Sequence, residues 1–250
     1  FAIALLTAVP VLAGPNTPPS TLDPKGNNAA AIAGLFNIVL IIAVAVFAIV
    51  EGLLLFSAWR FRHKQAGAVE PPQVHGNTRL ELAWTIVPAL IVVSLFVVTL
   101  QTQQKLDNKG SSEPIKVKVI GHQWWWEYQY TDLGITTATD LVMPTGRTVN
   151  LEITSIDVIH SFWIPQLNGK TDAIPNHINT SWLEADQPGT YFGQCAELCG
   201  DSHANMRSVV VAKDDADFQA WVSAQQAGPA QPSTADATAG QQVFMSGPCV

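Results

Sequence analysis

The sequence predicts a membrane-anchored all-β protein in which a hairpin of two transmembrane helices precedes a β-sandwich. Two long uncharged apolar stretches lie in its first half, and short runs of alternating apolar and polar residues follow them. The composition agrees, since 48% of the 250 residues are hydrophobic and only 13% are charged. Such a chain is too apolar for an ordinary soluble domain.

The first 14 residues have the character of a signal-peptide remnant. Phe1 to Ala13 is apolar over about the length of a signal-peptide core. The segment ends in Val11-Leu-Ala13, an acceptable cleavage pattern.

Residues 28–104 are expected to form the hairpin, with spans at about residues 30–58 and 82–102. Buried core helices are the alternative, and the length of both stretches disfavours it. Basic residues lie between the spans, and short basic loops stay in the cytoplasm: Arg60, Arg62, His63, Lys64 and Arg79. We therefore expect a multi-pass protein of the bacterial inner (cell) membrane, in contact with lipid, whose β domain is on the periplasmic, outer side.

Two carboxylates lie near the spans. A carboxylate inside a membrane is a functional candidate by default. For Glu51, late in the first span, we favour a position near the interface or a partner inside a larger complex. Glu81, three residues before Trp84, would lie at the cytoplasmic mouth of the hairpin, where a proton could be collected. Spacing alone leaves that role open, and Pro88 should kink the second helix.

Residues 111–226 are predicted to form the β-sandwich. Ile115, Val117 and Val119 alternate with lysines, and similar runs recur up to Ala212. A short helix over 214–225 would close the domain. Between residues 111 and 229 there are 14 acidic and 6 basic residues, a net charge of −8. This charge would either steer a basic partner or only maintain solubility, and we expect no nucleic-acid partner.

An aromatic run, Gly121-His-Gln-Trp124-Trp-Trp126-Glu-Tyr128-Gln-Tyr130, should form one of the strands. If the strand includes all of it, Trp124, Trp126 and the two tyrosines share one face. They would be sandwich core or an interfacial aromatic belt, unless an indole lies under a docking surface.

Metal-binding side chains cluster near residue 200. Cys195, Cys199, His203 and Met206 fall within a dozen residues, and His160 lies 35 positions upstream of Cys195. Sulfur and imidazole donors suit copper, and two thiolates suggest two bridged metal ions with one histidine on each. Such a site would carry electrons.

Two other interpretations stay open for these residues. The cysteines could form a disulfide, as in many exported proteins. A structural zinc site could use both cysteines and both histidines, but it would leave Met206 unused.

Several motifs together resemble subunit II of the aa3-type cytochrome c oxidases. The resemblance covers about residues 30 to 225, and the last motif, which holds the copper ligands, is very specific. The motifs are the hairpin, Gly121-His-Gln-Trp124, Asp157-Val-Ile-His160-Ser-Phe, Lys170-Thr-Asp-Ala-Ile-Pro175 and Gly193-Gln-Cys195-Ala-Glu197-Leu-Cys199-Gly-Asp-Ser-His203-Ala-Asn-Met206. The family usually has tyrosine where Trp125 stands, a change that we consider harmless.

The resemblance implies a cupredoxin fold with a dinuclear copper centre, CuA. Its ligands would be the side chains of His160, Cys195, Cys199, His203 and Met206, with the backbone carbonyl of Glu197. The Glu197 side chain would also reach a magnesium or manganese ion at the boundary with subunit I. Glu81 would sit at a proton-channel entrance, and Trp124 would receive the electron from cytochrome c.

The implied function is that of the electron-accepting subunit of a respiratory oxidase. Electrons from soluble or fused cytochrome c would reach the haem of subunit I, where oxygen reduction is coupled to proton pumping. The partners would be subunit I and other oxidase subunits. Within the family, a copper-free quinol oxidase subunit is the rival. A membrane-anchored copper carrier or sensor, or a nitrous-oxide-reducing enzyme, fits less well.

The end of the chain suggests a further domain. Residues 227–239 have the composition of a flexible linker, and residues 240–250 resemble the first helix of a c-type cytochrome. We hypothesise that Cys249 begins a Cys-x-x-Cys-His haem c attachment motif. The alternative is an unrelated tail with a stray cysteine.

Overall fold

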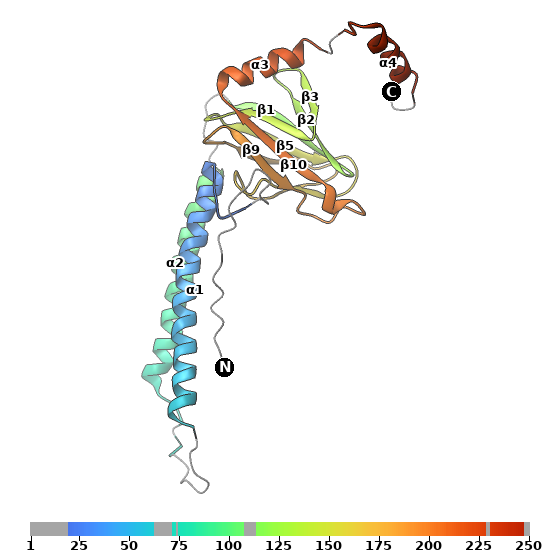
Figure 1. The fold of residues 1–250 in the computed structure, drawn as a ribbon. Coiled ribbons are helices and arrows are strands. Elements are labelled where there is room, and N and C mark those ends of the chain that lie inside the picture. The colour runs from blue at the N-terminus through green and yellow to red at the C-terminus, as the bar shows by residue number, and fades with distance from the viewer. Residues whose placement is uncertain (1–19, 63–71, 74, 108–113, 229–230, 248–250) are drawn as a thin grey trace.

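The computed structural model describes residues 20–62, 72–73, 75–107, 114–228 and 231–247. The predicted signal-peptide remnant at 1–14 and Cys249 lie outside the described residues. Two long helices form a stalk with a β domain at one end (Figure 1). This arrangement confirms the predicted fold class, a membrane hairpin followed by a cupredoxin-like sandwich.

The stalk consists of α1 (Asn27–Arg60) and α2 (Thr78–Asp107). Both are long and apolar enough to cross a membrane. At 1.5 Å per residue, the 34 residues of α1 extend about 51 Å, so the helix exceeds the hydrocarbon core of about 30 Å. Almost every side chain of the pair is exposed, which is the pattern expected of helices that contact lipid or other membrane helices.

The β domain has two main layers. A five-stranded sheet has the order β3-β2-β1-β5-β8, a three-stranded sheet has the order β4-β10-β9, and β6 pairs with β7. The strands are β1 (Ile115–His122), β2 (Trp125–Tyr130), β3 (Ile135–Ala138), β4 (Asp140–Pro144), β5 (Val149–Ser155), β6 (His160–Phe162), β7 (Thr171–Ala173), β8 (Asn179–Leu183), β9 (Gly189–Gln194) and β10 (Arg207–Lys213).

The alternation predicted from the sequence determines the core. Val117 and Val119 of β1 are fully buried and pair in parallel with Leu151 and Ile153 of β5. In β2, the inward residues are Trp126, Tyr128 and Tyr130, again fully buried. The Tyr130 hydroxyl donates to the Val142 carbonyl and accepts from the Val142 N–H, each at 2.7 Å, which ties the two layers together.

Strand β2 does not include the whole aromatic run, so Trp124 does not share this inward face. Strand β2 begins only at Trp125, and Trp124 lies in the preceding turn with 36% of its surface exposed. The turn, rather than the strand alternation, therefore sets the direction of the Trp124 indole.

Hydrogen bonds tie the hairpin to the β domain. The Ala29 N–H of α1 donates to the Leu167 carbonyl at 3.2 Å, and the Asn28 side chain donates to the Trp182 carbonyl at 3.0 Å. From the domain, the Trp182 indole donates to the Leu106 carbonyl at the end of α2, at 2.7 Å. Both helices are thus bonded to the same sheet.

Two helices follow the last strand. Helix α3 (Asp215–Gln226) covers one end of the sandwich and buries Phe218 and Val222. Helix α4 (Ala235–Met245) lies away from the β domain (Figure 1). It begins inside the predicted linker 227–239, because the Thr234 side chain caps it by accepting a hydrogen bond from the Ala237 N–H at 3.1 Å.

Candidate metal centre

Two loops at one end of the sandwich bring the predicted ligands together. Cys195 directly follows β9, Met206 directly precedes β10, and His160 is the first residue of β6. The Cys195 N–H donates to the Met206 carbonyl at 3.0 Å, which closes the cysteine loop on itself. The Ala196 N–H donates to the Ser161 carbonyl at 2.9 Å and joins this loop to His160.

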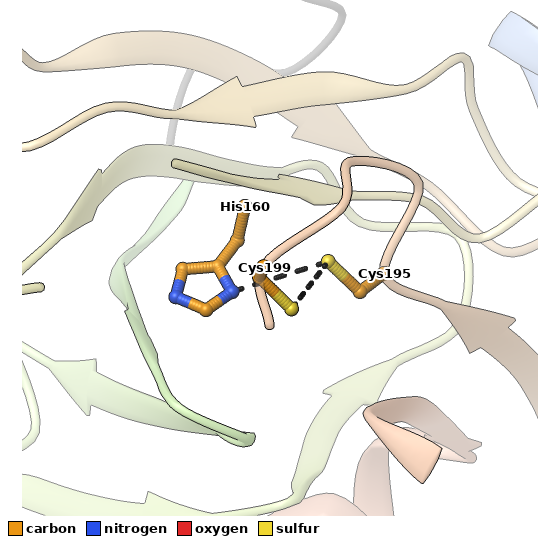
Figure 2. A group of neighbouring side chains, drawn as sticks. All are labelled: His160, Cys195 and Cys199. Carbon is orange, nitrogen blue, oxygen red and sulfur yellow. Dashed lines mark hydrogen bonds between the residues drawn. The ribbon is translucent and has the colours of Figure 1, made fainter. Parts of the chain in front are cut away.

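Two buried thiols lie at the centre of the site. The Sγ atoms of Cys195 and Cys199 are 3.8 Å apart, and both cysteines are free. Figure 2 shows the two sulfur atoms with the His160 imidazole beside them. The Nδ1 atom of His160 is 4.0 Å from Cys195 Sγ, and these three residues could hold a metal ion.

The remaining donors each lie close to one of the two sulfur atoms. His203 Nδ1 is 3.4 Å and Met206 Sδ is 3.8 Å from Cys199 Sγ. The Glu197 carbonyl is 3.2 Å from Cys195 Sγ. The site therefore has a histidine on either side of the sulfur pair, with a thioether and a carbonyl as further donors.

This arrangement disfavours the single-zinc interpretation. Four ligands of one tetrahedral zinc lie within about 4 Å of one another, given metal–ligand distances of about 2.0–2.3 Å. His160, Cys195 and Cys199 form a group with all donor atoms within 4.8 Å, and His203 lies outside it. Two free thiols also differ from the disulfide that the sequence left open.

The two thiols differ in acidity. Burial raises the pKa of Cys195, but hydrogen bonds from His160 and from neighbouring backbone and thiol groups outweigh it and lower that pKa to about 6. Burial, together with repulsion from the Cys195 thiolate, raises the pKa of Cys199 to about 12. The metal-free site thus holds one thiolate readily, and a second negative sulfur requires a nearby cation.

The His160 ring is held by Asp157. The Asp157 Oδ1 atom is 2.8 Å from His160 Nε2, and the ring is fully buried. Burial lowers the pKa of His160, but its contacts with Cys195 and Asp157 outweigh this and raise it. Burial likewise raises the pKa of Asp157, but hydrogen bonds from His160, Val158 and Gln123 outweigh it and lower that pKa.

Trp124 lies against the cysteine loop. Its indole N–H donates to the Cys199 carbonyl at 3.2 Å, and the Gln123 side-chain amide donates to the same oxygen at 2.7 Å. Five large apolar side chains on these loops are exposed: Trp124, Ile156, Val158, Ile159 and Leu198. The structure thus places the predicted indole at an apolar surface beside the thiols.

Glu81 lies far from this cluster, in the first turn of α2. Its carboxylate accepts a hydrogen bond from the Asn77 N–H at 3.1 Å, a contact that caps the helix start. The Glu197 side chain is exposed beside the thiols. The structure therefore brings together the sulfur, imidazole and indole groups, and it leaves the proton-channel prediction for Glu81 untested.

Sequence reasoning gave no role to Asp157, Gln123 or Gly121. A Cβ atom on Gly121 would lie 2.8 Å from Cδ2 of His160, so only glycine leaves room for the ring. The sequence signal for Asp157 was its position three residues before the predicted ligand His160, within a motif that was already noted.

Comparison with known families matches both parts of the chain. The model described as "Cytochrome C oxidase subunit II, periplasmic domain" matches residues 134–213. The model described as "Cytochrome C oxidase subunit II, transmembrane domain" matches residues 23–102.

Individual relatives are named either as cytochrome c oxidase subunits or as quinol oxidase subunits. The chain is 37% identical over 236 residues to cytochrome c oxidase subunit 2 of Alkalihalophilus pseudofirmus. The aligned region covers 92% of this chain and 69% of that protein. It is also 36% identical over 228 residues to quinol oxidase subunit 2 of Bacillus subtilis, covering 88% of this chain and 70% of that protein. The chain spans from about half to three quarters of the length of the relatives it matches.

Among solved structures, the periplasmic domain of subunit II of the Bradyrhizobium japonicum cytochrome oxidase is similar. The two are 30% identical with a TM-score of 0.46, over 48% of this chain and 99% of the other.

Proposed function

Because the chain belongs to the cytochrome c oxidase subunit II family, we propose that it is the subunit through which electrons reach a terminal oxidase of the bacterial inner membrane. It would accept electrons from cytochrome c at a dinuclear copper centre and pass them to the haem of subunit I. Oxygen reduction and proton pumping would take place in that larger partner.

The sulfur cluster is the observation that supports this proposal most directly. Two free, buried thiols have an imidazole on either side, together with a thioether and a carbonyl. Soft sulfur with imidazole is a donor set that fits copper. When bound, the copper pair supplies a one-electron carrier, and the side chains named above would hold it.

The protein contributes a fixed and largely dry setting for these donors. His160 and Met206 are fully buried, and both cysteines are nearly so. The backbone hydrogen bonds between the loops keep the donors in place. A rigid site changes little in shape when its charge changes, which suits electron transfer more than metal exchange and disfavours a copper carrier.

The exposed apolar loop surface is the proposed docking site for cytochrome c. Trp124 is central to it, because its indole is exposed and also bonded to the Cys199 carbonyl. The net charge of −8 over residues 111–229 would attract a basic donor protein to the domain.

Three further roles follow from the family resemblance. The exposed Glu197 carboxylate would reach a magnesium or manganese ion at the boundary with subunit I. Glu81, at the end of the hairpin far from the β domain, would sit at a proton-channel entrance. Cys249 would attach haem c if a cytochrome domain follows residue 250.

A quinol oxidase subunit is the second candidate, because relatives with that name match nearly as much of the chain. The presence of all five side-chain donors supports the copper-bearing form. Copper-loaded full-length chain in detergent is the test, measured by electron paramagnetic resonance. We expect one unpaired spin shared by two copper nuclei; a single-nucleus signal, or no bound copper, would contradict the proposal.

Oxygen uptake by the assembled complex separates the two donors. We expect oxygen uptake with reduced cytochrome c. Oxygen uptake with quinol but not with cytochrome c would favour the second candidate.

A further inference from the structure

The carboxylate of Asp157 contacts two groups that belong to different parts of the site. Its Oδ1 atom is 2.8 Å from Nε2 of His160, and its Oδ2 atom accepts a hydrogen bond from the Gln123 N–H at 2.6 Å. Gln123 precedes Trp124 in the turn that reaches the cysteine loop. One side chain therefore bridges the imidazole and the indole turn.

The first contact determines which nitrogen of His160 carries the proton. A carboxylate only accepts hydrogen bonds, so Nε2 must be the donor to Asp157. In the neutral ring Nδ1 then keeps its lone pair, and Nδ1 is the atom that faces Cys195 Sγ at 4.0 Å. The ring is thereby presented in the tautomer that a metal requires at that position.

The second contact positions the indole turn. With the Gln123 backbone held by Asp157, the Gln123 side chain and the Trp124 indole both donate to the Cys199 carbonyl. Through the Gln123–Trp124 turn, the Asp157 carboxylate thus also helps to position the loop that contains Cys199. Gln123 is 34 residues from Asp157 in sequence, so the contact exists only in the folded domain.

Asp157 is itself held firmly. Its Oδ1 atom accepts a hydrogen bond from the Val158 N–H at 2.6 Å and lies 3.1 Å from the Ser155 hydroxyl. The side chain is 27% exposed, so it borders the solvent at the mouth of the site. These bonds fix the carboxylate with Oδ1 directed at His160 and Oδ2 directed at the Gln123 N–H.

From this geometry we propose that Asp157 is a positioning residue, which fixes the metal-binding tautomer of His160 and the place of the Trp124 turn together. The inference rests on the proposed copper function. It extends that function to a residue outside the ligand set.

Asp157→Asn is the informative variant. Asparagine keeps the size but has a single acceptor oxygen, so its NH₂ group must face either the His160 and Val158 N–H groups or the Gln123 N–H. Asp132→Asn is the matched control, since it removes the same charge from an exposed turn where Asp132 pairs with Lys116 at 3.8 Å.

The first measurement needs no copper. Full-length chain in detergent, labelled with ¹⁵N-histidine, is studied by NMR near pH 9, roughly where a histidine ring is neutral. We expect the His160 signal of the unaltered chain and of Asp132→Asn to show a protonated Nε2, and that of Asp157→Asn to show a mixture of tautomers. A protonated Nδ1 in the unaltered chain, or the same tautomer in all three, would overturn the proposal.

The second measurement uses copper. Compared with Asp132→Asn, Asp157→Asn is expected to bind copper about 10- to 100-fold more weakly, as for other residues that orient metal ligands. Its resonance spectrum and midpoint potential should shift as well. Affinity, spectrum and potential equal to those of the control would refute the role.

If the unaltered chain binds no copper, the proposed function fails. The tautomer measurement still decides the role of Asp157.

Discussion

The indole N–H of Trp124 donates a hydrogen bond to the backbone carbonyl of Cys199, with 3.2 Å between the nitrogen and the oxygen. Cys199 is buried, whereas 36% of the Trp124 surface is exposed. A surface ring is therefore joined to a residue of the proposed metal site through one polar contact. A donor protein on this surface would be close to the sulfur pair without touching it.

Trp124→Phe should slow electron input severalfold. Phenylalanine keeps an aromatic ring but lacks the N–H that bonds to Cys199. The rate is measured as reduction of the copper centre by cytochrome c after rapid mixing. Trp125→Phe is the control, because Trp125 is similarly exposed but stacks on His122, with 4.0 Å between the ring centroids. Equal rates in the two variants would argue against a special role for Trp124.

Met206→Leu should leave the protein folded and change the potential of the site. The two side chains have similar volumes, so the fully buried position should lose less than about 1.5 kcal/mol of stability. Potentiometric titration and thermal unfolding of the copper-loaded chain provide the two readouts.

Met143→Leu is the control for this change. Met143 is equally buried but lies in β4, away from the thiols. If Met206→Leu leaves both the potential and the electron-transfer kinetics unaltered, Met206 is not a ligand.

Gly121→Ala should displace the His160 ring. The new Cβ atom would lie 2.8 Å from Cδ2 of His160 and 3.3 Å from Cζ3 of Trp126, and both rings are fully buried. Overpacking of this kind lowers stability by about 1–3 kcal/mol. We also expect weaker copper binding, measured by competition with a chelator.

The control for Gly121→Ala is Gly189→Ala in β9. There the nearest contact of the added Cβ is with the Tyr191 ring at 3.7 Å, an ordinary packing distance. Copper affinity equal to that of this control would show that the ring has room to move.

Copper binding should release about one thiol proton per chain between about pH 7 and pH 11. In the metal-free site the pKa of Cys195 is about 6 and that of Cys199 about 12, so one sulfur in this window is already a thiolate. Because the Cys199 proton competes with the metal, the apparent affinity should rise with pH across the window. A weakly buffered indicator dye measures the release.

His160 adds to this release at the lower end of the window, since its pKa is raised and only the neutral ring binds a metal. The Cys199→Ser variant should lose the thiol proton and keep the histidine contribution. Release of two thiol protons at pH 8 would contradict the assigned acidities.

Periodicity predicted most of the strands, and spacing predicted that the sulfur and imidazole groups lie close together. The alternation of Val117 and Val119 predicted β1 correctly, because sandwich strands have one buried face. The cysteine loop was recognisable because its sulfur and imidazole donors fall within a dozen residues. In each case the residues that form the pattern are close together in the sequence.

The direction of Trp124 and the role of Asp157 could not be predicted in this way. Both depend on the turn after β1 meeting the turn after β5, a contact set by the parallel pairing of these two strands. The start of α4 depended on one cap, Thr234, within a stretch whose composition is typical of a linker.

The bonds that join both helix ends to one sheet have a mechanical effect. Because Asn28 and Leu106 are each bonded to Trp182, we expect the hairpin and the β domain to tilt together. Tilting of the stalk, in a bilayer thinner or thicker than the helices prefer, would tip the sulfur pair by the same angle. Lipid thickness would then set how the proposed docking surface is presented to a donor in the aqueous phase.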